Sequence, residues 1–168
     1  MVTLLFLSLF LVTLYVGVTT WKLGELPDSI SSMVYVLPEG GWRWLWTVWL
    51  WAVALLTCIP AIEALRPKSL EVFGFFTMAC LVFTGAMPLF LKDQERTHHI
   101  LAIAGGIFSQ IVVLFVSPWF LALWLLMVWL LLDSLTASET PRWYDGKSVF
   151  ISEAICYASF FGSLIFYF

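Results

Sequence analysis

The sequence predicts an all-α fold: a polytopic integral membrane protein with six transmembrane helices in one bundle. Hydrophobic residues make up 62% of the chain and charged residues 11%, whereas a soluble domain carries about 25% charged residues. The apolar residues form long continuous runs. This favours helices, because the strands of a membrane barrel alternate between apolar and polar residues. Six such runs leave almost nothing from which to build a soluble domain.

The apolar runs are separated by short polar gaps, and each is long enough, or nearly so, to cross a hydrocarbon core of ~30 Å as a helix. They cover about 2–21, 44–62, 70–91, 99–116, 119–135 and 149–168. The first run has no Lys or Arg before it and no small-residue cleavage site after it, which favours a membrane helix over a signal peptide. Ser117-Pro118 is expected to be a turn, because 99–135 is too long for one span. Residues 1–168 are therefore predicted to form one domain, with both termini on the same side.

Nearly all charged side chains are predicted to lie on one face of the bundle, because six spans make the loops alternate between two sides. That face holds six of the eight basic residues and nine of the eleven acidic residues. The positive-inside rule places the face richer in basic residues in the cytoplasm and both termini outside, although the acids on the same face weaken this preference. The net charge of −3 and the lack of a polybasic patch give no sign of nucleic-acid binding.

Residues 27–38 are predicted to form a short amphipathic segment at the membrane surface. Asp28 and Ser29 follow Pro27 and can cap a helix by accepting backbone N–H groups. Apolar residues then recur at helical spacing, at Ile30, Met33, Val34 and Leu37. The segment is either an interfacial anchor or a lid or floor over a pocket.

Five tryptophans stand close together where the second apolar run begins: Trp42, Trp44, Trp46, Trp49 and Trp51. Tryptophan favours the headgroup boundary, where its ring is apolar and its N–H stays hydrated. The first three fit such a belt. The two deeper ones either pack against lipid and protein or form an aromatic wall for a lipid or a flat ligand.

Small residues form stripes on two of the predicted helices, and such stripes allow close helix packing. They are Thr47, Ala54, Cys58 and Ala61 in the second run, and Ser152, Cys156, Ser159 and Ser163 in the last. The cysteines Cys58, Cys80 and Cys156 match no metal or redox motif. We expect them to be buried free thiols.

The fourth run begins at His98 and His99 and continues to Gln110, which lies ~16 Å further along a helix and close to mid-membrane. An amide at that depth needs a partner on another helix or a wet cavity. His99 shares its stripe with Gly106 and Gln110, so we expect His99, and not His98, to face the interior. If a pocket exists, it should open beside His99 and be walled by the tryptophans of the second run.

Asp133 and Glu153 approach the polar face from the last two helices, in either a structural or a functional role. Together with Asp28, His98 and His99 they are predicted to gather near that face, within ~15 Å, half of the hydrocarbon core. Adjacent histidines on a regular helix point about 100° apart, and the chain has no third histidine. The sequence therefore predicts no metal site, and nothing in it calls for a cofactor.

Several short motifs follow one another in a recognisable order. They are Pro27, Ser29 and Ser31 before a Trp-led helix, Gly85 and Pro88 at the end of the third run, and His98 and His99 at the start of the fourth. Over about 26–110 this order resembles a six-helix membrane superfamily that includes DRAM-type and Sfk-type proteins, the lipid-remodelling proteins of GPI-anchor maturation and bacterial members of unknown function. The resemblance implies a six-helix bundle with a lipid-related role, which we expect in a bacterial inner membrane. Its positions of interest are Ser29, Ser31, Trp42, Pro88 and His99. In that family the first loop lies away from the cytoplasm, whereas the count of basic residues places the first loop of this chain in the cytoplasm.

Two classes of function stay open. The first is a protein without a catalytic motif that binds a membrane lipid, another amphipathic ligand, or a membrane partner, a second copy included. The residues predicted to bind the ligand are Asp28, Ser29, Ser31, Trp42, Trp46, Trp49, His99 and Gln110. The alternative is a membrane-embedded lipid hydrolase. Its candidate catalytic residues are His98, His99, Asp133 and Glu153, where a histidine acts as base beside a carboxylate at the membrane boundary.

Overall fold

The computed structural model describes residues 1–168 except 32, 37–40, 91–94, 137–143 and 145. All regular secondary structure in these described residues is helical, as the composition predicts. The elements are α1 (Val2–Leu23), α2 (Met33–Val36), α3 (Gly41–Leu65), the 3-10 helix η1 (Arg66–Lys68), α4 (Glu71–Phe90), α5 (Glu95–Val116), the 3-10 helix η2 (Pro118–Leu123), α6 (Trp124–Thr136) and α7 (Ser148–Tyr167).

Four stretches are long and apolar enough to cross a membrane, judged by length and composition. They are Val2–Leu23, Trp44–Lys68, Arg96–Val116 and Ser148–Tyr167. Two further apolar stretches, Glu71–Met87 and Pro118–Ser134, are shorter over the residues described. The fifth run is interrupted at its start because Pro118 opens a 3-10 helix of six residues before α6 begins. Four helices thus have the length and composition of membrane spans, and six spans remain a prediction.

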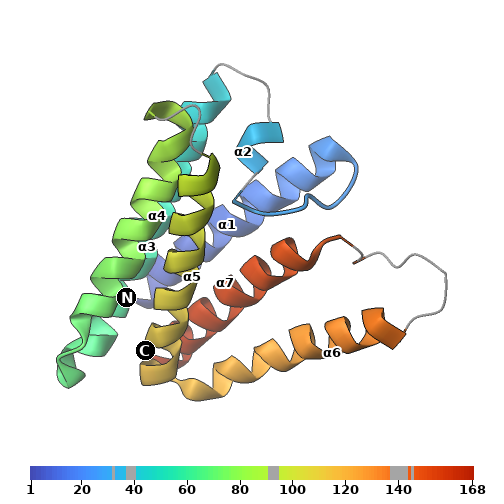
Figure 1. The fold of residues 1–168 in the computed structure, drawn as a ribbon. Coiled ribbons are helices and arrows are strands. Elements are labelled where there is room, and N and C mark those ends of the chain that lie inside the picture. The colour runs from blue at the N-terminus through green and yellow to red at the C-terminus, as the bar shows by residue number, and fades with distance from the viewer. Residues whose placement is uncertain (32, 37–40, 91–94, 137–143, 145) are drawn as a thin grey trace.

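The helices α3, α4 and α5 stand side by side, and α1 and α7 cross them obliquely (Figure 1). The helix α6 leaves the bundle at η2 and diverges from α7. Both chain ends lie at the end of the molecule where α5 passes into η2 (Figure 1). Along the chain, α5 ends at Val116, as the expected turn at Ser117-Pro118 requires.

The contact between α3 and α4 follows from the small residues on α3. Thr47, Ala54, Cys58 and Ala61 are each at most 2% exposed, which confirms that this stripe faces the protein. The hydroxyl of Thr47 donates to the backbone oxygen of Gly85 on α4 at 2.6 Å. Gly74 of α4 comes so close to α3 that a Cβ on it would lie 2.8 Å from Cγ1 of Ile62.

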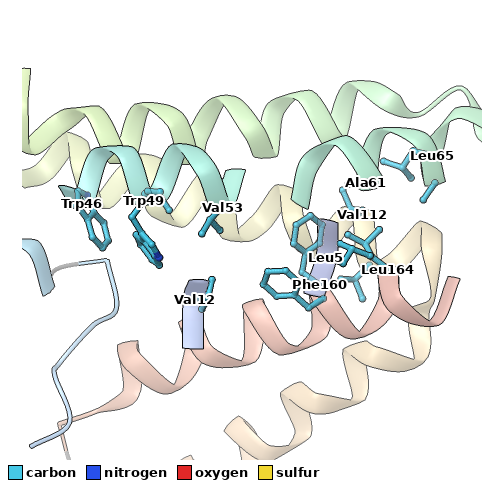
Figure 2. Close-up of a cluster of buried hydrophobic side chains, with 14 of the residues drawn as sticks. Leu5, Val12, Trp46, Trp49, Val53, Ala61, Leu65, Val112, Phe160 and Leu164 are labelled. Carbon is cyan, nitrogen blue, oxygen red and sulfur yellow. The ribbon is translucent and has the colours of Figure 1, made fainter. Parts of the chain in front are cut away.

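A cluster of buried apolar side chains joins four helices around the contact between α3 and α4. Figure 2 shows it with residues from α1, α3, α5 and α7, among them Leu5, Val12, Val53, Ala61, Val112, Phe160 and Leu164. The side chains are drawn from helices far apart in sequence. The cluster therefore holds the two ends of the chain against the central hairpin.

Gln110 finds the interhelical partners that its depth requires. Its Oε1 accepts from Nε1 of Trp124 on α6 at 3.0 Å and from the hydroxyl of Ser159 on α7 at 2.9 Å. Its Nε2 lies 3.4 Å from the backbone oxygen of Cys156, to which it donates. The expected partner on another helix is confirmed, because the amide ties α5 to both of the last two helices, and its predicted role in ligand binding stays a prediction.

The two histidines face the opposite way from our expectation. His98 is 0% exposed, whereas His99 is exposed. Gly105 shares the His98 stripe, and a Cβ there would lie 3.2 Å from Cβ of Cys80 on α4, so this stripe faces α4. Gln110 faces α7 as expected, but α7 diverges from α5 towards the histidine end (Figure 1). The expectation that His99 faces the interior is wrong because α7 does not cover it.

We predict that Gly74→Ala lowers the stability of the bundle and that Gly17→Ala does not. A Cβ on Gly74 would also lie 3.2 Å from the backbone nitrogen of Ile62, so α3 and α4 would have to separate. Overpacking of this kind costs about 1–3 kcal/mol. Gly17 has nothing within 4 Å of its Cβ position, and alanine there favours the helix by up to ~1 kcal/mol. Thermal unfolding in detergent measures both, and equal midpoints would contradict the close α3–α4 contact.

Candidate functional site

Four of the predicted site residues meet where the segment after α1 passes the start of α7. The carboxylate of Glu153 accepts from the hydroxyl of Ser29, at 3.0 and 3.1 Å from its two oxygens. It also accepts from the backbone N–H of Ile30 and, at 3.2 Å, from that of Ser31. The hydroxyls of Ser29 and Ser31 lie 2.8 Å apart. One carboxylate thus holds three consecutive residues of the segment.

Asp28 attaches the same segment to α7 from its other side. Its backbone oxygen accepts from the N–H of Phe150 at 3.0 Å, which is one of the N–H groups that a helix start leaves without an intrahelical partner. Its carboxylate pairs with Nζ of Lys147 at 2.6 Å. We call Asp28, Ser29, Ser31, Lys147 and Glu153 the loop clamp. Ser29 is 6% exposed, so the clamp uses its polar groups mainly to fix the chain.

The segment after the clamp also packs inward. Ile30 is 4% exposed, and Met33 and Val34 are 0% exposed. The described helix within the predicted amphipathic segment is short, Met33–Val36, and residues 32 and 37–38 lie outside the described part. These apolar side chains are covered by protein. A location of the segment at the membrane surface stays a prediction.

The other candidate catalytic residues, Asp133, His98 and His99, are not among the residues of the loop clamp. The carboxylate of Asp133 accepts from the hydroxyl of Tyr144. The rings of His98 and His99 pack edge to face, with centroids 5.8 Å apart. Over the described residues, no group of three or more His, Cys, Asp or Glu side chains could hold a metal ion. The prediction for Trp42 concerns a side chain outside that part of the chain.

A cavity of about 270 Å³ opens between α1 and α3, and we call it the α1–α3 groove. Its lining comprises Leu11, Leu14, Tyr15, Val18, Thr19, Lys22, Leu45, Trp46 and Trp49. The two tryptophans were expected to wall a pocket. The α1 wall was not expected, although Leu11, Tyr15, Val18 and Lys22 recur at the spacing of one helix face. His99 is not among the lining residues, so this groove is not the pocket that was expected beside His99.

Three aromatic rings of the groove lining pack against one another. Tyr15 stacks on Trp49 with ring centroids 4.2 Å apart, and Trp46 lies 5.0 Å from Trp49. Nε1 of Trp49 donates to the backbone oxygen of Leu11 at 2.9 Å, which fixes α3 against α1. Figure 2 shows both tryptophans on the side of α3 that faces Val12 of α1. The wall is therefore built of rings in mutual contact, one of which is hydrogen-bonded across the two helices.

We predict that Glu153→Gln loosens the loop clamp. An amide offers one acceptor oxygen and two N–H donors where the carboxylate offers two acceptor oxygens, so one or more of the N–H and O–H groups of residues 29–31 loses its acceptor. Leaving such a group buried and unsatisfied costs about 1–3 kcal/mol. The melting temperature should fall, and protease should cleave near Ser29 faster.

The control for the clamp is Glu63→Gln. It removes one partner of the surface ion pair between Glu63 and Arg66, in which the nitrogen and oxygen atoms lie 2.7 Å apart. Exposed ion pairs contribute no more than ~1 kcal/mol to the free energy of unfolding. Equal melting temperatures and equal cleavage rates for the two variants would contradict the clamp.

The chain matches no protein-family model, no curated protein and no solved structure. The resemblance to a six-helix membrane superfamily therefore stays a prediction from its short motifs.

Proposed function

We propose that this protein is a six-span membrane protein that binds an amphipathic molecule of the bilayer, such as a lipid, in the α1–α3 groove. The observation that supports this most is the lining of the groove. Its walls are aliphatic and aromatic, as in most small-molecule sites, and the lining includes Lys22 in the last turn of α1. An apolar wall that extends to the last turn of the helix suits a molecule that has an apolar chain and a polar head.

The lengths of the two shorter helices support six spans. The twenty residues of α4 extend ~30 Å. The thirteen residues of α6 extend ~20 Å, and the six residues of η2 add ~12 Å at the wider rise of a 3-10 helix. Both lengths approach the ~30 Å of a hydrocarbon core. The common position of the two chain ends supports an even number of spans (Figure 1).

A binding role is better supported than a hydrolase. The hydroxyl of Ser29 donates to Glu153, but the hydrogen bonds that define the loop clamp include no histidine. A histidine acting as base would have to stand within hydrogen-bond reach of a nucleophile or water beside a carboxylate. The clamp instead positions the chain that leaves α1, the helix that forms one wall of the groove.

Six spans predict that both termini are reached from the same side of the membrane. Single cysteines placed at residues 2 and 168, in a variant with the three native cysteines replaced by serine or alanine, should react with an impermeant thiol reagent from one side. Labelling from opposite sides would contradict the even number of spans, while leaving the helical fold untouched.

A bulky side chain inside the groove should reduce lipid binding. We predict that Val18→Trp, at a residue lining the groove, lowers the amount of lipid retained through purification severalfold, measured by native mass spectrometry. Leu7→Trp is the matched control, because Leu7 is also on α1 and 48% exposed but does not line the groove. Equal retention by the two variants would show that the groove is not the binding site.

A further inference from the structure

The surface that the lining residues present to the α1–α3 groove is entirely apolar, although several of these residues have polar groups. Nε1 of Trp46 is buried, and Nε1 of Trp49 donates to a backbone oxygen of α1. The hydroxyl of Tyr15 is buried as well, and Thr19 on the same helix is its hydrogen-bond partner. Lys22 lines the groove with the methylene groups of its side chain. The lining therefore offers an occupant neither a hydrogen bond nor a charge.

The size of the groove fits part of one hydrocarbon chain. Its lining residues on α1 run from Leu11 to Lys22, which is ~16 Å along the helix axis. The groove has a volume of about 270 Å³. An apolar cavity of about 150 Å³ stays dry and admits benzene, which has six carbons, so on that scale this groove takes about ten carbons. That is part of a single acyl chain, and it leaves no room for a second chain or for a head.

The position of the groove places hydrocarbon at its opening in the six-span arrangement proposed above. All of its lining residues belong to Val2–Leu23 or Trp44–Lys68, two of the stretches that have the length and composition of a membrane span. Leu14 and Val18, on the α1 wall, are each about half exposed, so the groove opens outwards from the bundle. The chains of bilayer lipids are then the molecules that meet it.

We infer that the groove holds one hydrocarbon chain of a membrane lipid without its head, so that the protein binds the lipid by its chain and is indifferent to the headgroup. This inference rests on the proposed function and specifies which part of the ligand is recognised. A polar head inside the groove would give up its hydrogen bonds to water and gain none. A chain gains dispersion contacts with walls that an empty groove would leave without partner atoms.

The test uses a photoactivatable lipid in a bilayer. The full-length protein is reconstituted in nanodiscs with phosphatidylcholine that carries a diazirine in the middle of one chain, and the cross-linked residues are mapped by mass spectrometry. Cross-links should concentrate on Leu14, Val18 and Leu45 of the lining, relative to Phe6 and Phe10, which are exposed on α1 outside the groove. A diazirine in the head should not label the lining. Equal labelling of the two sets by the chain probe, or labelling of the lining by the head probe, would overturn the inference.

Competition on the wild type separates the chain from the head and needs no variant to fold. Unlabelled lipids with identical chains, which carry a phosphocholine head, a phosphoglycerol head or only the hydroxyl of diacylglycerol, should reduce cross-linking of the lining equally. If the phosphoglycerol lipid competes severalfold better than diacylglycerol, the groove recognises a head and the inference is wrong.

Two variants distinguish a failure of this inference from a failure of the proposed function. Lys22→Met keeps an unbranched side chain and removes the charge, so cross-linking of the lining should equal that of the wild type. Val18→Trp should lower it severalfold by filling the groove. If Lys22→Met lowers cross-linking severalfold and Val18→Trp does so too, a head is bound in addition to the chain, and only the proposed function stands. If Val18→Trp leaves cross-linking unchanged, the groove holds no chain and both fail.

Discussion

The packing of α3 against its neighbours is the contact on which the rest of the bundle depends. In a bilayer, apolar side chains gain little by leaving lipid, so close packing and interhelical hydrogen bonds must hold helices together. On one side of α3, Thr47 bonds to α4 where Gly85 leaves room. On the other side, α1 bonds to α3 through the hydroxyls of Ser8 and Thr57, 2.6 Å apart, and through Trp49.

The loop clamp and the groove are coupled through α1. The helix packs on α3 along one side and is exposed along much of the other, where Phe6 and Phe10 are more than half exposed. The C-terminal end of α1 is held by the clamp. The chain turns at Gly24, whose φ is 75°, and a few residues later it bonds to the carboxylate of Glu153 on α7. A carboxylate that does not line the groove therefore holds the chain that leaves one of its walls.

Sequence periodicity predicts the features that depend on one helix alone. The small stripe of α3 is buried as expected, and Gln110 has the partners that an amide at its depth requires. Features that depend on where a second helix passes are not predictable in this way. His98 is buried and His99 is exposed, the reverse of the prediction. His99 stays uncovered because α7 diverges from α5, and no local sequence pattern encodes that divergence.

The candidate site also has features that the sequence predicts and features that it does not. The alternating topology predicted from the sequence places Asp28 and Glu153 at one face, and the structure joins them through the segment that holds Ser29 and Ser31. Which groups bond is set by the path of the backbone over residues 28–31, which the sequence does not specify. The tryptophans of the groove are conspicuous in the sequence. Their α1 partner, Tyr15, is not, because a single tyrosine in an apolar run resembles any other lipid-facing aromatic residue.

The distance along the chain between Ser29 and Glu153 has a consequence for biosynthesis. The two residues are 124 positions apart, so α1 is synthesised long before the carboxylate that secures its outgoing chain. At about 5–20 residues per second, a ribosome needs roughly 6 to 25 seconds to reach it. During that interval α3, α4 and α5 can pair as sequence neighbours, while α1 is held chiefly by its contacts with α3. Helix α1 is thus among the last elements to be fixed, and termination before α7 would leave it unsecured.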